Sequence, residues 1–221
     1  SRWLKAPNVY GGKGGGLNRL EPIEKPETHI PNKDKDKNKD KNNIPNATHQ
    51  DRVSIFADVS PDAFYYDAVQ WAVEEGITNG TGAATFGSYD VCNRAAVVTF
   101  LWRAMGSPEP ETAENPFVDV KTTDFFYKPV LWAVEEGITN GISDTCFDPA
   151  GSCNRASVVT FLWRAAGEPA PAAGDLPFSD VPASAWFAEP VLWAVQEGVT
   201  NGVSATSFDA AAICNRASVV T

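Results

Sequence analysis

Residues 71–80 read Trp-Ala-Val-Glu-Glu-Gly-Ile-Thr-Asn-Gly, and the same ten residues recur at 132–141. A close variant, Trp-Ala-Val-Gln-Glu-Gly-Val-Thr-Asn-Gly, stands at 193–202. Each copy follows the previous one after 61 residues, and no insertion breaks this register from Phe56 onward. Internal repetition of this length is the signature of a repeat protein. We therefore divide the chain into three repeats, 56–116, 117–177 and 178–221.

Each repeat is predicted to contain two helices. The first is expected to begin at Pro129 and Pro190 in repeats 2 and 3, because proline suits the first helical position. In repeat 1 it is expected at Ala68, with Asp67 as the cap. A glycine followed by an apolar residue ends this helix, at Gly76, Gly137 and Gly198. The second helix is predicted to start after Asn93, Asn154 and Asn215 and to end at Gly106 and Gly167.

A loop rich in turn residues separates the two helices, and a single aromatic residue is expected to anchor it in the core: Phe86, Phe147 or Phe208. A two-helix unit of this size cannot bury both of its faces alone, so neighbouring repeats must share a core. The sequence therefore predicts a mostly α fold. It consists of three helix-loop-helix repeats packed about a pseudo-threefold axis, with the loops as prongs.

Charge divides the chain into two parts. Residues 1–50 hold 10 basic and 6 acidic residues, whereas residues 51–221 hold 8 basic and 22 acidic ones. We expect 1–32 to be a flexible segment that follows a missing upstream region, and 33–55 to be a charged linker. The acidic repeats argue against nucleic acid as a partner, and no apolar run is long enough for membrane insertion. Because the chain begins at Ser1 and its third repeat stops at Thr221, we expect it to be part of a longer protein.

Several of these residues, in this order, resemble the S-layer homology (SLH) module. They are Phe-x-Asp-Val, the aromatic residue eight positions after that Phe, Trp-Ala-Val-Glu-x-Gly-Ile, Asn-Gly followed by Thr-Phe, and the x-Arg-Ala start of the second helix. The resemblance covers 56–221. It implies a non-catalytic module without a cofactor, which anchors proteins outside the cell on bacterial walls. The implied ligand is an anionic, commonly pyruvylated secondary cell-wall polymer, bound in grooves between prongs.

The family signature Ile-Thr-Arg-Ala-Glu stands here as Cys-Asn-Arg-Ala followed by Ala96, Ser157 or Ser218. The capping-box glutamate is therefore absent, although asparagine remains a good cap. Candidate ligand-binding residues are the arginines, the capping asparagines and the aromatic residues that align with the family's prong aromatic. They are Arg94, Arg155 and Arg216, Asn93, Asn154 and Asn215, and Phe64, Phe125 and Trp186.

The chemistry of these residues suits a sugar that carries a carboxylate. A helix N-terminus offers unpaired N–H groups, a guanidinium pairs with a carboxylate, and an aromatic ring can cover a sugar face. The alternative is that each arginine ties its helix to a neighbouring loop, for example to Asp58, Asp119 or Asp180. Arg103 and Arg164 lie near helix C-termini, where a cation is favourable, and they are interpreted as structural.

The cysteines leave two questions open. Cys92, Cys153 and Cys214 share one repeat position and are interpreted as small buried apolar residues, rather than as a three-thiolate metal site. Cys146 replaces Thr85 and Ser207 of the other repeats, so a Cys146–Cys153 disulfide is an alternative that a secreted protein permits.

We find no arrangement of a nucleophile and a base. The paired carboxylates Glu74-Glu75 and Glu135-Glu136 point in different directions on a helix, and we interpret them as part of a solvated face. The main hypothesis is a cell-surface anchor without catalytic activity. The alternative hypothesis is a self-associating S-layer or surface-lattice protein, in which the repeats contact protein instead of glycan.

Overall fold

The structure is a computed structural model, and it describes residues 54–221. The predicted flexible segment at 1–32 and nearly all of the predicted linker at 33–55 lie outside these residues. Six helices are formed in the described part. They are α1 (Tyr66–Glu74), α2 (Arg94–Ala104), α3 (Tyr127–Glu135), α4 (Arg155–Ala165), α5 (Ala188–Gln196) and α6 (Arg216–Val220). Within 54–221, none of them has the length and apolar character that crossing a membrane requires.

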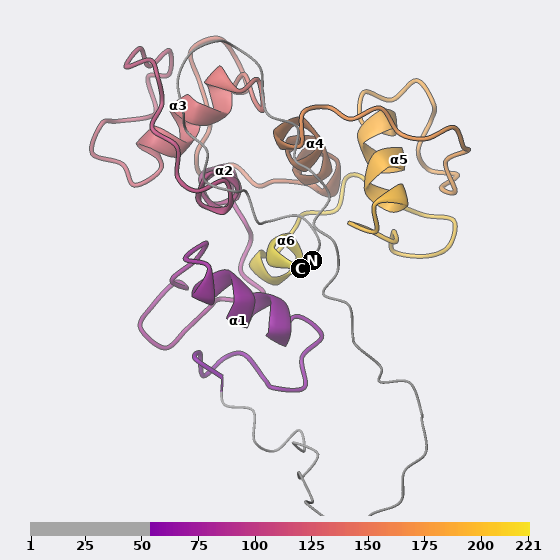
Figure 1. The fold of residues 1–221 in the computed structure, drawn as a ribbon, viewed down its shortest axis with the longest axis horizontal. Coiled ribbons are helices and arrows are strands. Elements are labelled where there is room, and N and C mark those ends of the chain that lie inside the picture. Colours follow the sequence, from indigo (N-terminus) through magenta and orange to yellow (C-terminus); the bar gives the residue numbers. More distant parts are fainter. Residues whose placement is uncertain (1–53) are drawn as a thin grey trace, which may run out of the picture.

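The helices pair between repeats. The second helix of each repeat packs on the first helix of the next, so α2 contacts α3 and α4 contacts α5. The last helix, α6, returns to contact α1 of the first repeat. Figure 1 shows the result: α2, α4 and α6 lie near the centre, and α1, α3 and α5 lie in three lobes around them. The mostly helical fold with threefold character that the sequence predicts is therefore confirmed.

A triangle of backbone hydrogen bonds joins the three repeats at one cysteine position. The Cys92 N–H donates to the carbonyl of Cys214 (2.9 Å), the Cys153 N–H to that of Cys92 (3.3 Å), and the Cys214 N–H to that of Cys153 (2.9 Å). Each repeat thus donates to one neighbour and accepts from the other. The ring of contacts is closed, and the first and last repeats are adjacent.

The first helix of each repeat begins earlier than the sequence predicted. Helices α3 and α5 start two residues before Pro129 and Pro190, which occupy the third helical position. Proline is tolerated there because the first N–H groups of a helix have no partner within it. Asp67 is not the cap of α1 but lies in its first turn, where a carboxylate is favourable.

The other helix boundaries follow the prediction closely. The Asn93 side chain accepts from the N–H of Ala96, and Asn154 and Asn215 make the same contact with Ser157 and Ser218. At the end of α1, Gly76 has φ +70°. The Ile77 N–H donates to the Ala72 carbonyl and the Gly76 N–H to that of Val73, which is a Schellman motif.

An aspartate clamps the inter-helix loop in every repeat. In repeat 3, Asp180 accepts the backbone N–H groups of Phe208 and Asp209, both at 2.8 Å, and the Ser207 hydroxyl at 2.7 Å. These bonds place Phe208, which has no exposed surface. They also lower the pKa of Asp180 to about 2, because the backbone N–H groups of Phe208 and Asp209 stabilise the carboxylate.

This clamp predicts an acid-dependent contribution to stability. A carboxyl group whose pKa is lowered by folding stabilises the protein above its ordinary pKa of 3.8, and the contribution is lost as the pH falls toward 2. We expect the melting temperature of Asp180→Asn to lie below that of the unmodified chain at pH 7, with the gap closing between about pH 4 and pH 2. Thermal unfolding at half-unit pH steps measures it. A gap that stays constant to pH 2 would contradict the prediction.

A polar side chain at the end of α3 and of α5 binds the backbone of the link that precedes its repeat. Glu135 accepts the backbone N–H groups of Glu111 and Thr112. Gln196, its counterpart in repeat 3, accepts from the Ala172 N–H and donates to the Ala172 carbonyl. Glu135 is exposed, as expected for part of a solvated face, and it also binds the linker backbone, which the sequence did not indicate. The exchange of Glu for Gln is explained, because both side chains can accept from the linker backbone.

An apolar cleft of about 70 Å³ lies beside the end of α6, between side chains of α1, α2, α4 and α6. In α2 and α4 the corresponding threonine is followed by Phe-Leu-Trp-Arg-Ala. We expect that adding these five residues after Thr221 raises the free energy of unfolding by about 2 kcal/mol, because their apolar side chains become buried. Denaturant unfolding compares this chain with one extended by Ser-Gly-Ser-Gly-Ser. Equal stability of the two would count against the prediction.

Candidate functional site

The three signature arginines tie the repeats together in a cycle. The Arg94 Nε donates to the Phe147 carbonyl (2.8 Å) and its Nη2 to the Thr139 hydroxyl (3.2 Å). Arg155 makes the same two bonds to repeat 3, and Arg216 makes them to Phe86 and Thr78 of repeat 1. Each arginine thus binds the loop of the next repeat. The alternative that each arginine ties its helix to a neighbouring loop therefore describes these contacts, but the partners are not Asp58, Asp119 and Asp180, which accept backbone N–H groups of the loops.

The N-termini of the second helices are not available to a ligand. The N–H of Arg94 donates to the Gly151 carbonyl and that of Ala95 to the Pro149 carbonyl, while Asn93 takes the third N–H. The other two helices have equivalent bonds. The expectation that these helix ends offer unpaired N–H groups to an anion was therefore wrong, because the neighbouring repeat satisfies them. The asparagine side chains likewise serve as caps.

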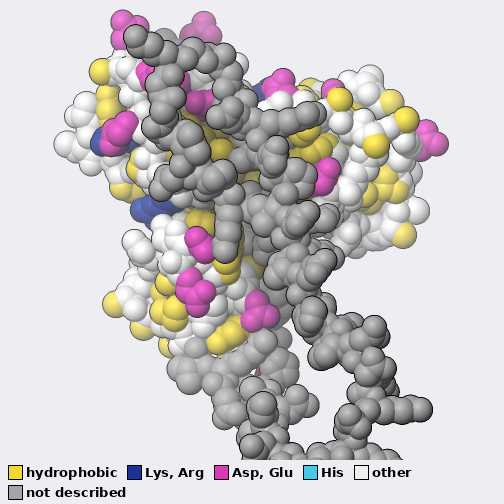
Figure 2. All heavy atoms as spheres, viewed as in Figure 1, with side chains coloured by type: hydrophobic (Ala, Val, Ile, Leu, Met, Phe, Trp, Pro, Cys, Tyr) yellow, Lys and Arg dark blue, Asp and Glu magenta, His cyan; other side chains and the backbone are white. Residues whose placement is uncertain are grey.

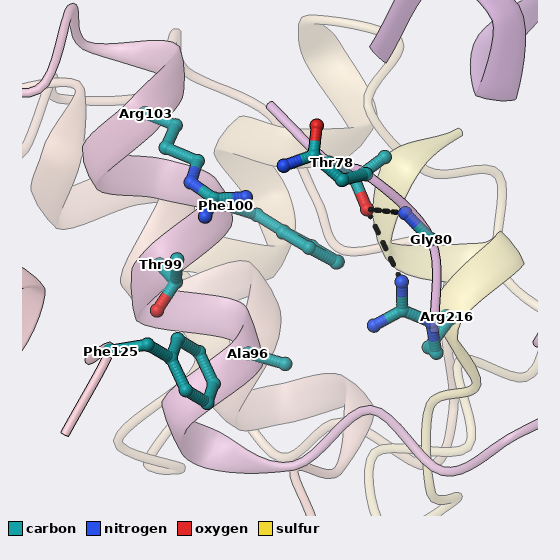
Figure 3. Close-up of a pocket in the computed structure, with 9 residues that line it drawn as sticks. Thr78, Gly80, Ala96, Thr99, Phe100, Arg103, Phe125 and Arg216 are labelled. Carbon is teal, nitrogen blue, oxygen red and sulfur yellow. Dashed lines mark hydrogen bonds between the residues drawn. The ribbon is translucent and has the colours of Figure 1, made fainter. Parts of the chain in front are cut away.

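A cavity of about 220 Å³ opens where all three repeats meet, and we call it groove 1. Its lining residues are Thr78, Asn79, Gly80, Ala96, Thr99, Phe100, Arg103, Phe125 and Arg216. Figure 3 shows Arg103 and Phe100 projecting from α2 toward the loop that carries Thr78 and Gly80, with Arg216 on the far side. Groove 1 therefore brings two guanidinium groups and an aromatic ring, Phe125, to one cavity.

Arg216 is rigidly held in groove 1. Its guanidinium carbon lies 4.9 Å from the centre of the Phe86 ring and 5.1 Å from that of Phe100. The side chain is only 8% exposed, and burial lowers the pKa of Arg216. Arg103 donates to the Ile77 carbonyl at 3.1 Å. Arg103 thus has the structural role that the sequence suggested, and it also lines groove 1. Thr78 and Phe100 line the groove too, although the sequence analysis did not identify them as site residues.

The equivalent positions of the next repeat, with Arg94 in the place of Arg216, are called groove 2 by analogy with groove 1. They are Thr139, Asn140, Gly141, Ser157, Thr160, Phe161, Arg164, Trp186 and Arg94. Arg94 lies over the Phe161 ring at 5.6 Å, and Arg164 donates to the Ile138 carbonyl at 3.1 Å, as in groove 1. For a third groove, the positions of Phe100 and Arg103 would correspond to 222 and 225, beyond Thr221.

The three aromatic candidates are all on the surface. Phe64 is 78% exposed, Phe125 69% and Trp186 63%. Each ring stands edge-on to the aromatic residue that follows it, with centroid separations of 5.1–5.2 Å. Their exposure leaves the ring faces accessible to a ligand. Phe125 is the one among them that lines groove 1.

All four cysteines are free, so the Cys146–Cys153 disulfide that the sequence left open is not formed in the structure. The Cys146 thiol instead donates to the Asp119 carboxylate at 3.0 Å, where repeat 3 has a serine hydroxyl. Cys153 is buried at the backbone triangle with Cys92 and Cys214. Burial raises the pKa of Cys92 to about 12 and that of Cys153 to about 11, so these thiols are neutral. Within 54–221, no group of three or more His, Cys, Asp or Glu residues could hold a metal ion.

The repeats carry many more acidic than basic side chains. Figure 2 shows acidic side chains spread over the visible lobes and few basic ones. Two arginines at a single cavity are therefore a local exception in a chain with a formal net charge of −10. The long-range field repels an anion, whereas the contacts inside the groove attract one.

The family model for the S-layer homology domain matches residues 55–95, 116–159 and 177–219, more than half of the chain. The chain belongs to the S-layer homology domain family. SLH domains are cell-wall anchoring modules, and the matched part is a non-catalytic module. The predicted location, the bacterial cell surface, follows from this membership.

Curated relatives match part of this chain and are much longer. A cell surface protein of Thermoanaerobacter kivui is 30% identical over 51% of this chain and 15% of its own length. An S-layer protein of Bacillus thuringiensis subsp. finitimus is 26% identical over 70% of the chain and 19% of its own length. An endoglucanase of Bacillus sp. (strain KSM-635) is 29% identical over 50% of the chain and 11% of its own length. The aligned region thus spans less than a fifth of each of these relatives.

Proposed function

We propose that the three SLH repeats hold a longer surface protein on the cell wall by binding an anionic, pyruvylated secondary cell-wall polymer in groove 1. The observation that carries this proposal is the meeting of Arg103, Arg216 and the exposed Phe125 ring around one cavity. No catalysis is proposed for the repeats. The activity of the whole protein would belong to the region upstream of the predicted linker at 33–55.

The arginines supply the contact for the acidic group. The contacts within the protein use one N–H on Nε and one on Nη2 of Arg216, and a guanidinium has five N–H groups in total. The remaining N–H groups are available to a carboxylate at the cavity wall. A guanidinium pairs with a carboxylate in a planar, bidentate geometry. A pyruvate ketal places such a carboxylate directly on a sugar ring.

The aromatic ring supplies the contact for the sugar. Phe125 presents an exposed ring at the edge of groove 1, where it can cover the apolar face of a pyranose. Asn79, which is exposed, adds an amide group that can bond to sugar hydroxyls. The cavity therefore combines an anion contact, an apolar platform and a neutral polar group, which is the set that an acidic sugar requires.

Phe125→Ala tests this proposal with a matched control. We expect it to weaken binding to wall sacculi by about tenfold, because the platform for the sugar is lost. Phe64→Ala should leave binding unchanged, since Phe64 is as exposed as Phe125 and stacks similarly but does not line groove 1. Co-sedimentation with sacculi that retain the polymer, and with sacculi stripped of it, measures the effect. Equal binding to stripped and unstripped walls would contradict the proposal.

Self-association is the second candidate, and exposed apolar side chains in the inter-repeat links and loops favour it. Val118 is 82% exposed, Ile142 59% and Val203 57%. Surfaces of this kind can contact another protein molecule. Sedimentation velocity over a hundredfold concentration range tests it. Growth in mass without polymer would support a surface lattice, whereas a constant monomer mass would exclude it.

A further inference from the structure

We propose that the two grooves are unequal, and that groove 1 binds an anionic sugar more tightly because residue 107 is a serine where groove 2 has Glu168. This inference rests on the proposed function and extends it, since it assigns the main site and names the residue that controls its selectivity for charge.

The two grooves share the geometry of their arginines. Arg216 bonds the Thr78 hydroxyl at 3.2 Å in groove 1, and Arg94 bonds the Thr139 hydroxyl at 3.2 Å in groove 2. Arg103 and Arg164 each donate to a backbone carbonyl at 3.1 Å. The positions of the positive charges are therefore matched. A difference in affinity for an anion must come from the groups around them.

One carboxylate distinguishes these surroundings. The Glu168 Oε1 lies 3.9 Å from the Arg164 Nε, so it offsets the charge that groove 2 offers to a ligand. Among residues 54–221, no carboxylate forms such a pair with Arg103, and the position equivalent to Glu168 is occupied by Ser107. Groove 1 thus has no carboxylate at this position, whereas in groove 2 the Glu168 carboxylate partly offsets the attraction of Arg164 for an anion.

The backbone at this position is the same in both repeats. Ser107 has φ +57° and Glu168 has φ +54°. Their N–H groups donate to the Trp102 and Trp163 carbonyls at 2.9 and 3.0 Å. Each residue therefore adopts the same left-handed conformation after its helix end. Exchanging the two residues should add no backbone strain. The exchange changes the charge beside the arginine and little else.

The other differences between the lining residues of the two grooves are uncharged. Groove 2 has Trp186 and Ser157 where groove 1 has Phe125 and Ala96. These residues affect contact with the neutral part of a sugar, and the larger indole would favour groove 2. Comparing an acidic sugar with its neutral ester separates the effect of charge from these contacts. The exchanges at 107 and 168 then separate Glu168 from charges that flank the aromatic residues, such as Asp124 beside Phe125, where Ala185 stands beside Trp186.

Amide NMR titration of the full chain can follow the grooves separately. Gly80 reports on groove 1 and Gly141, its equivalent, on groove 2. The probe is a methyl hexopyranoside with a 4,6-pyruvate ketal, and its methyl ester is the neutral control. The variants are Ser107→Glu and Glu168→Ser.

The ratio of acid to ester affinity should be roughly fivefold higher at Gly80 than at Gly141, as expected for one charge at short range in a solvated site. Ser107→Glu should lower the ratio at Gly80 to that of groove 2, and Glu168→Ser should raise the ratio at Gly141. Both changes should shrink in 0.5 M salt, where the screening length is about 4 Å.

Two results overturn the inference in distinguishable ways. If both glycine amides shift with the acid but the ratios are equal and unchanged by the exchanges, residue 107 or 168 does not control selectivity, while the proposed function stands. If neither amide shifts with the acid, the proposed function fails and the inference fails with it.

Discussion

Replacing Arg216 with alanine should lower the free energy of unfolding by about 3 kcal/mol. The substitution leaves the buried carbonyl of Phe86 without its donor and removes the second bond to Thr78, which is itself buried. It also empties the space between the Phe86 and Phe100 rings. The loss should be large because these contacts join residues 130 and 138 positions apart and hold the last repeat against the first.

Urea unfolding of the full chain measures this effect, with two comparisons. Arg155→Ala should lower the free energy of unfolding less than Arg216→Ala does, because Arg155 is partly exposed and lies over one ring, that of Phe208. Arg216→Lys should recover only part of the loss, since an ammonium group cannot reproduce the fixed fork that reaches the carbonyl and the hydroxyl together. If Arg216→Ala stays within about 0.5 kcal/mol of the unmodified chain, the arginine cycle is not a stabilising feature.

Phe147→Ala should have a larger effect than Arg216→Ala and lower the free energy of unfolding by about 4 kcal/mol. The side chain has no exposed surface and packs against Phe117 at a centroid distance of 5.6 Å. The Arg94 guanidinium lies 4.8 Å above the same ring. Alanine would leave a cavity at the point where the loop of repeat 2 meets the arginine of repeat 1, and the surrounding structure can collapse only in part.

The same pair predicts a coupling that can be measured. Arg94→Ala removes the cation over the ring, and Phe147→Ala removes the ring under the cation. The double variant should therefore lose less stability than the sum of the single losses, by about 1 kcal/mol. Phe147→Leu serves as the milder control, because it keeps most of the volume and should cost less than the alanine substitution. Strict additivity would show that the stacking contributes nothing.

The sequence predicted those parts of the fold that local chemistry determines. Asn93 and its equivalents cap the second helices because a short side-chain oxygen can reach the third N–H group. Gly76 and Ile77 end the first helix because glycine tolerates the left-handed conformation and the next residue completes the motif. The repeat length alone indicated that neighbouring copies share a core. The starts of α3 and α5 were misplaced by two residues because proline suits several positions of the first turn.

The site was less predictable because it is built from contacts between repeats. The N–H groups of Arg94 and Ala95 donate to the carbonyls of Gly151 and Pro149. These bonds depend on how repeat 2 packs on repeat 1, and no local sequence pattern predicts that packing. The sequence indicated Arg103 only as a favourable cation at a helix end. It also lines groove 1, and this is evident only once the fold brings Arg216 of repeat 3 to the same cavity. The recurrence of Thr-Asn-Gly before each loop was the one signal in the sequence that could have pointed to Thr78.

The closed triangle of Cys92, Cys153 and Cys214 has a consequence for how this architecture can evolve. Open repeat arrays lengthen or shorten by whole units, because each unit contacts only its neighbours and the ends remain free. Here the third unit donates its hydrogen bond to the second and accepts one from the first, so a fourth unit would find no open end and a pair of units would leave a gap. Duplication within a gene can therefore add a second complete trio to such a protein, but it cannot extend the existing one by a single copy.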